Sequence, residues 1–118
     1  MKDFKKLIVW QKAMEVVKDV LEIADGMNQN DKFIFSSQMG KCAISIPSNI
    51  AEGAGRNGSK DFARFLDIAI GSSFELETQL TLCVGRPNVK SSKIESTIIK
   101  LHEVQKMQFG LLKKVRIG

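Results

Sequence analysis

Few of the residues that build reactive sites occur in this sequence. It contains one histidine, two cysteines, one tryptophan and no tyrosine among 118 residues. A metal site needs several closely spaced His, Cys or acidic ligands, and no Cys-x-x-Cys pair is present. His102 stands alone, and Ile99 three residues before it excludes the Glu-x-x-His motif of di-iron bundles. The glycine-rich run 53–58 follows a predicted helix and lacks the phosphate-binding lysine. We predict no enzyme activity, no metal and no other cofactor.

Long apolar runs are missing as well. No run approaches the roughly 20 residues that span a bilayer, and the charged residues 1–6 are not followed by a clean apolar segment. We therefore expect neither a membrane partner nor a signal peptide. Cys42 and Cys83 each lie in an apolar helical setting. We interpret them as small buried residues in a reducing cytoplasm, with a disulfide or a metal pair as the alternative.

The pattern of apolar residues favours helices. The sequence has only two prolines, and apolar residues recur every three or four positions in four segments. We expect helices over about residues 6–25, 36–53, 59–83 and 91–115, with Gly26 as a left-handed stop, Asp31 or Ser36 near the second start, and Ser59 as the third cap. The short connections predict an all-α, up-down-up-down four-helix bundle, with residues 1–118 as a single domain.

Each predicted helix has an apolar face that should point into the bundle. For the first helix these residues are Leu7, Trp10, Met14, Val17, Leu21 and Ala24. For the second they are Phe35, Met39, Cys42, Ile46 and Ile50. For the third they are Phe62, Leu66, Ala69, Ser73, Leu76, Leu80 and Cys83. For the fourth they are Ile94, Ile98, Leu101, Val104, Leu111 and Val115.

Residues 45–56 are the most unusual stretch of the chain. Pro47 interrupts a helical run, so we expect a kink near residues 43–46 and a side-chain bond to the freed carbonyl from Ser45, Ser48 or Asn49. Gly53 and Gly55 should end the helix. In the next helix Gly71 and Ser72 are small, which predicts close contact between the backbones of the second and third helices.

Charged residues in the same stretch suggest ion pairs. Glu52 and Arg56 are four residues apart, which suits a pair at a helix end. Glu75 is predicted to reach Arg56 or Lys41 across helices. We favour a structural ion-pair network here, and the alternative is that Arg56 contacts nucleic acid or protein.

Positive charge is concentrated near the C-terminus. The net charge is +5, and residues 86–118 hold eight basic and two acidic residues. Such asymmetry is typical of proteins with an anionic partner, most often nucleic acid, although a solvated lysine-rich face is the alternative. The predicted nucleic-acid-binding residues are Lys93, Lys100, Lys106, Lys113, Lys114 and Arg116.

Several apolar residues lie outside the predicted core faces. Left exposed, they would form patches larger than a monomer normally carries. We therefore predict a closed, cyclic homo-oligomer. These residues are Phe4, Ile8, Val16, Val20, Ile70, Phe74 and Ile99.

Three segments, residues 7–14, 45–53 and 65–77, carry a resemblance to a known family. Their Leu-Ile-Val-Trp-Gln-Lys-Ala-Met, Ser-Ile-Pro-Ser-Asn-Ile-Ala-Glu-Gly and Gly-Ser-Ser-Phe-Glu-Leu sequences resemble the four-helix bundle proteins encoded within intervening sequences of bacterial 23S rRNA genes. That group is similar to accessory proteins of diversity-generating retroelements. The chain departs from the common pattern at residues 40–42, where arginine is frequent, and at Arg86-Pro87, where a longer linker is usual.

The resemblance implies a left-handed bundle that assembles as a homopentamer with a role near RNA or DNA. It implies no established activity. Our hypothesis is a non-enzymatic, oligomeric adaptor that binds nucleic acid through its basic surface. The alternative is a scaffold that binds only protein, for example a reverse transcriptase.

Overall fold

The structure, a computed structural model that describes residues 3–117, is built from helices alone within that range. A 3-10 turn precedes the first long helix, and a short helix and a π turn lead into the second, so that four long helical segments result. The elements are η1 (Phe4–Lys6), α1 (Ile8–Gly26), α2 (Gln29–Asp31), η2 (Lys32–Ser36), α3 (Ser37–Ala54), α4 (Ser59–Leu82) and α5 (Ser91–Ile117). The predicted all-α four-helix architecture is confirmed.

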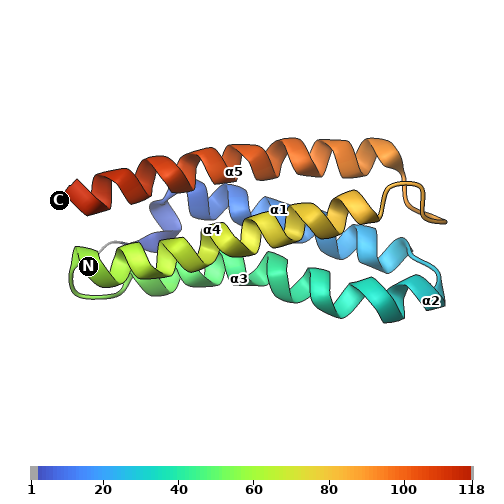
Figure 1. The fold of residues 1–118 in the computed structure, drawn as a ribbon, viewed down its shortest axis with the longest axis horizontal. Helices are drawn as coiled ribbons and strands as arrows, with labels where there is room; N and C mark the ends of the chain where they lie inside the picture. The colour runs from blue at the N-terminus through green and yellow to red at the C-terminus, as the bar shows by residue number, and fades with distance from the viewer. Residues whose placement is uncertain (1–2, 118) are drawn as a thin grey trace.

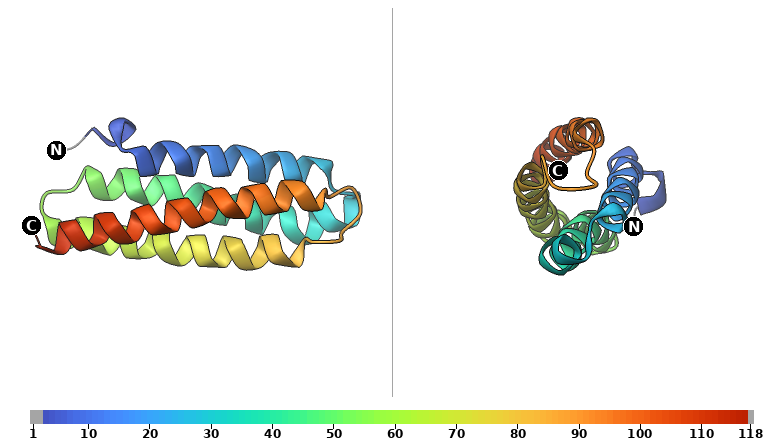
Figure 2. Two further views of the ribbon diagram at one scale, coloured as in Figure 1. Left: turned by 90° about the horizontal axis from the view of Figure 1, so that it is seen from above. Right: turned by 90° about the vertical axis from the view of Figure 1, so that its right-hand side faces the viewer.

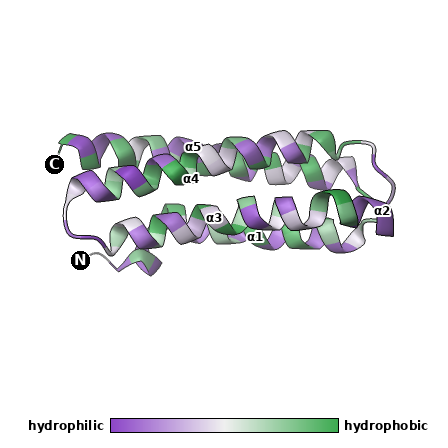
Figure 3. Cartoon of the chain, turned by 60° about the horizontal axis from the view of Figure 1, so that its bottom comes forward, coloured by the Kyte–Doolittle hydropathy of each residue, from purple (hydrophilic) through white to green (hydrophobic). Residues whose placement is uncertain are grey.

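Successive long helices run in opposite directions and pack side by side (Figures 1 and 2). α3 contacts α1 and α4, and α5 contacts α4 and α1, so the four helices close a ring around one apolar core. The bundle measures 47 × 22 × 20 Å. The start of α1, the α3–α4 turn and the end of α5 all lie at one end of it (Figure 1). Hydrophobic and hydrophilic residues alternate along each helix (Figure 3). No helix in the described range is both long and apolar enough to cross a membrane.

The core face of α4 agrees with the sequence, whereas that of α1 does not. All seven predicted residues of the third helix, from Phe62 to Cys83, are buried. In α1 the most buried residues include Val16 and Val20, while the predicted Leu21 is 45% exposed. Apolar residues cover most of the circumference of α1, so periodicity alone did not fix which of them face inward. In α5, Ile98 and Leu111 are only partly buried, whereas Gln105 and Gln108 are buried.

Three helix ends also differ from the prediction. Gly26 is the last residue of α1 and is not left-handed; among the described glycines only Gly58 and Gly85 have positive φ. α2 begins after Asn28, which caps it: the Asn28 side chain accepts a bond from the Asp31 backbone N–H at 2.9 Å. Ser59 is the first residue of α4 rather than its cap, because Gly58, with φ of 103°, takes the cap position. α2 therefore starts at a side-chain cap and α4 at a glycine with positive φ.

Gly53, rather than Gly71, makes the close contact between α3 and α4. Gly53 lies inside α3 and is buried, and a Cβ there would come within 2.9 Å of both Phe62 Cδ1 and Phe65 Cβ. Gly71 is exposed, and a Cβ there would meet no atom within 4 Å. The expected close approach at Gly71 is therefore wrong. The tight contact between α3 and α4 is at Gly53, and Gly55 takes the position after the last residue of α3.

The middle of the α3–α4 contact is polar. Ser45 Oγ and Ser72 Oγ share a hydrogen bond of 2.9 Å. Asn49 Nδ2 donates to the Ser45 carbonyl at 2.8 Å. α3 continues through the buried Pro47, which removes the donor for the carbonyl of Ala43. The Asn49 amide thus binds a carbonyl two residues away from the one that we expected.

Candidate nucleic-acid interface

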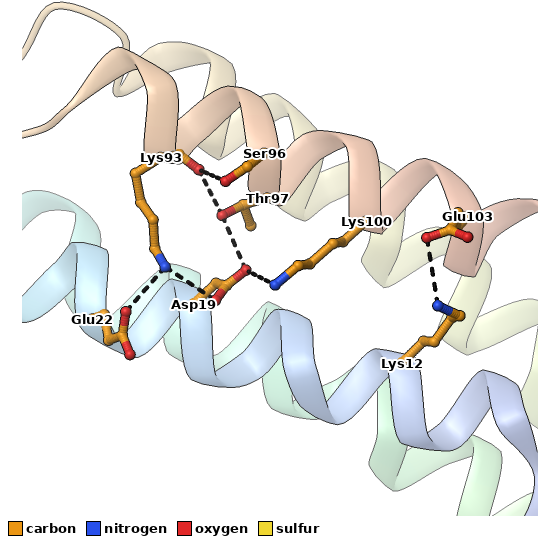
Figure 4. A network of polar contacts seen from close by, with 8 residues as sticks. All are labelled: Lys12, Asp19, Glu22, Lys93, Ser96, Thr97, Lys100 and Glu103. Atoms are coloured by element: carbon orange, nitrogen blue, oxygen red, sulfur yellow. Dashed lines mark hydrogen bonds and ion pairs between the residues drawn. The ribbon is translucent and has the colours of Figure 1, made fainter.

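Lys93 and Lys100, two of the predicted nucleic-acid-binding residues, point into the bundle seam between α1 and α5 (Figure 4). Lys93 Nζ donates to Asp19 Oδ1 at 3.2 Å, and Lys100 Nζ donates to Asp19 Oδ2 at 3.0 Å. Lys93 also pairs with Glu22 at 3.0 Å. Asp19 is only 7% exposed. The two lysines therefore neutralise a buried carboxylate of their own chain, and sequence analysis missed Asp19 because α1 and α5 are far apart along the chain.

The pKa values of these groups follow from the geometry. Burial raises the pKa of Asp19, but the hydrogen bonds and charges of Lys100 and Lys93 outweigh it, so the pKa lies below its ordinary value. Hydrogen bonds to Glu22 and Asp19 raise the pKa of Lys93. Both pKa shifts favour the charged forms, so ionised Asp19 and Lys93 link α1 to α5 at neutral pH.

The other four predicted contact residues lie on the outside of α5. Arg116 Nη2 pairs with Asp67 Oδ2 of α4 at 3.1 Å, and both side chains are more than half exposed. Lys106, Lys113 and Lys114 are exposed. Within residues 3–117, no carboxylate lies within ion-pair distance of these three lysines. They are the predicted cations that remain fully available to a partner.

The fold places the net positive charge in one half of the bundle. The half with the start of α1, the α3–α4 turn and the end of α5 comprises residues 3–17, 42–70 and 104–117. It contains ten Lys and Arg and five Asp and Glu. The opposite half, residues 18–41 and 71–103, contains seven and eight. We call the first half the basic half; it holds Lys106, Lys113 and Lys114.

The predicted ion-pair network around residues 45–56 forms only in part. Glu52 and Arg56 make the expected pair, with Oε1 and Nη2 2.7 Å apart. Glu75 does not reach Arg56 or Lys41; its Oε2 accepts from Cys42 Sγ at 3.3 Å instead. Arg56 lies beyond the end of α3, whereas Glu75 lies level with Cys42 in the middle of the bundle. Burial, followed by the bond to Glu75, raises the pKa of the Cys42 thiol.

The cysteines are free and buried, as predicted. Cys83 Sγ lies 3.6 Å from the sulfur of Met39. Burial raises the pKa of the Cys83 thiol too, so both sulfurs are held in their unreactive protonated form at neutral pH.

His102 has a partner that the sequence did not indicate. Its Nε2 lies 3.0 Å from Glu77 Oε2, and Gln105 Nε2 donates to Glu77 Oε1 at 2.9 Å. The bonds from His102 and Gln105 lower the pKa of Glu77. The nearby hydroxyls of Thr78 and Thr81 donate to carbonyls of their own helix. The bonds of Glu77 to His102 and Gln105 thus link α4 to α5. No group of three or more metal-ligating side chains occurs in the part of the chain that the structure describes.

Arg64 and Phe65 are a further feature of the basic half that sequence analysis missed. The guanidinium carbon of Arg64 lies 4.5 Å from the centroid of the Phe65 ring, and that of Arg56 lies 5.0 Å from it. The adjacent Arg64 and Phe65 could have indicated a cation–π contact from the sequence. That Arg56, which follows the end of a different helix, contacts the same ring could not be read from the sequence.

Architecture and comparisons together place the chain among the all-α, up-down-up-down four-helix bundle proteins. The family model described as 23S rRNA-intervening sequence protein matches residues 5–110. The chain belongs to that family, and the resemblance drawn from its sequence is confirmed.

A solved structure has the same fold. It is a Bacteroides thetaiotaomicron VPI-5482 protein described as a protein with unknown function from the S23 ribosomal protein family. The two chains share 24% identity with a TM-score of 0.82, over 90% of this chain and 99% of the other. A search of curated proteins gave no match.

Proposed function

We propose that this protein is a non-enzymatic, oligomeric adaptor of the cytoplasm that associates with nucleic acid through its basic half. The observation that carries the proposal is the separation of charge along the bundle, with three exposed lysines of α5 unpaired among residues 3–117. The family description refers to intervening sequences of 23S rRNA, and we therefore take RNA as the first partner to test.

The chemistry of these lysines defines the kind of binding. A lysine ammonium is a point charge that neutralises a phosphate without reading a base. Binding through Lys106, Lys113 and Lys114 therefore depends on the phosphate backbone and weakens steeply as salt rises. Lys93 and Lys100 take no part in this surface, because moving them would leave Asp19 buried without its counter-charges.

Oligomerisation is the second part of the proposal. Of the apolar residues predicted to lie outside the core, Val16, Val20 and Ile70 are buried in the bundle, which corrects that part of the argument. Ile8, Phe74 and Ile99 remain 60%, 48% and 64% exposed. We propose that copies of the chain cover such residues in a cyclic homopentamer, which repeats the lysines around one ring and adds avidity. Light scattering at micromolar concentration should return five times the 13.1 kDa chain mass, and a monomer mass would contradict it.

The nucleic-acid role is tested with two triple variants of equal charge. K106Q/K113Q/K114Q removes the unpaired lysines of the basic half. K18Q/K32Q/K41Q removes three exposed lysines of the other half and serves as the control. In fluorescence anisotropy titrations with a structured RNA at low salt, we expect the first variant to bind about tenfold more weakly than wild type. The control variant should bind within about twofold, because it leaves the phosphate contacts in place.

Equal weakening in both triple variants would show that only total charge matters and would contradict a localised surface. No binding of the wild-type protein at low salt would favour the protein-binding scaffold. Phe33, 88% exposed in the π turn at the opposite end of the bundle, supports that second role.

A further inference from the structure

The α3–α4 turn holds two arginines against one aromatic ring. Arg56 follows the end of α3, Arg64 lies in the second turn of α4, and both guanidinium groups stack on Phe65 at 5.0 and 4.5 Å from its centroid. Gly53 leaves room for Phe65 against α3, since a Cβ at residue 53 would lie only 2.9 Å from Phe65 Cβ. The absent side chain of Gly53 thus lets Phe65 sit against α3 and carry both arginines.

A carboxylate of the same helical segment orders each guanidinium further. Arg56 Nη2 donates to Glu52 Oε1 at 2.7 Å, and Arg64 Nε lies 3.5 Å from Asp61 Oδ1. The two arginine side chains are nevertheless 45% and 58% exposed, so other N–H donors of each fork face water. Exposed pairs of this kind are weak and exchange readily for a better acceptor. The arginine side chains are therefore ordered before binding, while part of each guanidinium stays accessible to a phosphate.

We propose that Arg56 and Arg64 on Phe65 form an arginine clasp for a backbone phosphodiester of the bound nucleic acid. The proposal rests on the nucleic-acid role above and names a contact of that surface. A planar guanidinium offers paired donors that match phosphate oxygens, and a stacked one loses less conformational freedom on binding. Lys60, exposed in the first turn of α4, adds a third positive charge close by.

The end of α5 lies at the same end of the bundle as the clasp (Figure 1). Arg116 of α5 pairs with Asp67 of α4, one turn after Arg64 along that helix. A nucleic-acid strand that crosses this end of the bundle thus meets the α3–α4 turn and the end of α5 in succession. Sequence-independent phosphate contact from two elements fixes the register of the strand on the protein.

The first experiment separates the effect of the planar, paired N–H donors of arginine from the effect of its charge. R56K/R64K keeps the net charge but removes both stacked guanidinium groups, and R86K makes the same exchange in the opposite half of the bundle, at an arginine whose donors are bound by Asp31. With the structured RNA at low salt, we expect R56K/R64K to lose about tenfold in affinity and R86K, checked for its helical fold by circular dichroism, to change less than twofold. Wild-type affinity of R56K/R64K, with weak binding of K106Q/K113Q/K114Q, overturns the clasp and leaves the proposed function standing. Absence of binding by wild type overturns both.

A second measurement uses the unaltered protein, so it does not depend on the folding of a variant. The Arg Nε–H signals of Arg56 and Arg64 are followed by NMR while the RNA is added, and we expect both to shift and to exchange more slowly with water. Unchanged signals at saturating RNA overturn the clasp. An equal shift with inorganic phosphate at the same phosphate concentration overturns its assignment to a nucleic-acid backbone. The same shift with an acidic peptide, but not with RNA, overturns it in favour of a protein partner.

Discussion

Replacing Gly53 with alanine should destabilise the bundle, although alanine is the better helix former. The new Cβ would lie 2.9 Å from Phe62 Cδ1 and from Phe65 Cβ, and 3.3 Å from the Phe62 carbonyl oxygen. A backbone carbonyl and a Cβ cannot rotate away, so α3 and α4 must move apart. Overpacking of this kind costs about 1–3 kcal/mol, which exceeds the gain of about 0.5–1 kcal/mol from replacing a helical glycine. We expect a net loss of about 1–2 kcal/mol.

Gly71→Ala is the matched control. Gly71 lies inside a helix as Gly53 does, but its new Cβ would meet nothing within 4 Å. We therefore expect only the helix gain of about 0.5–1 kcal/mol. Both variants receive the helix gain, so they should differ by the overpacking cost of about 1–3 kcal/mol, or about 4–12 °C in Tm at about 4 °C per kcal/mol for a chain of this length.

The assay is thermal unfolding followed by circular dichroism, at one protein concentration for all samples, because assembly makes the Tm depend on concentration. A Tm of Gly53→Ala at or above that of wild type would refute the close-contact reasoning. A Tm of Gly71→Ala that lies as far below that of wild type as the Tm of Gly53→Ala would refute it as well.

Three further predictions concern the buried charges. The pKa of Asp19 is lowered in the folded protein, so the stabilisation from its ionised form is present above the unfolded pKa of about 3.9 and is lost as the pH falls through the lower folded pKa. The urea midpoint should therefore fall further between pH 7 and pH 3 for wild type than for Asp19→Asn. Equal falls in the two proteins would contradict this prediction. Lys93→Gln should lower the Tm more than Lys106→Gln, because only Lys93 neutralises Asp19 and Glu22; equal Tm values would show the seam to be dispensable. Asp31 is fully buried, and its two carboxylate oxygens accept hydrogen bonds from the Arg86 guanidinium at 2.8 and 3.0 Å. Asp31→Asn should lower the free energy of unfolding, measured by chemical denaturation, by about 2–3 kcal/mol. A loss below about 0.5 kcal/mol would contradict a stabilising role for this ion pair.

The sequence predicts the buried face of α4 better than that of α1. Every residue predicted for the α4 face, from Phe62 to Cys83, is buried. α1 is apolar on most of its circumference, so the pattern could not distinguish Val16 and Val20, which are fully buried, from the exposed Leu21. The inward face of such a helix is decided by the positions of its two neighbours, which sequence spacing does not contain.

The same distinction applies to the charged residues. The pair of Glu52 and Arg56 depends on spacing within one helix and was predictable. The pair of Lys93 and Asp19 joins residues 74 positions apart, and only packing reveals that Lys93 faces inward. The charge imbalance was visible near the C-terminus, but its extension to the α3–α4 turn follows from the antiparallel fold.

Cross-linking of bound RNA to the protein tests the central claim most directly. Irradiation of the complex with ultraviolet light, followed by mass spectrometry of the cross-linked peptides, identifies the residues in contact with the RNA. The account predicts cross-links in residues 42–70 and 104–117, including Phe65, on which Arg56 and Arg64 stack, and Phe109, which is 49% exposed on α5. Cross-links confined to residues 18–41 and 71–103 would contradict it.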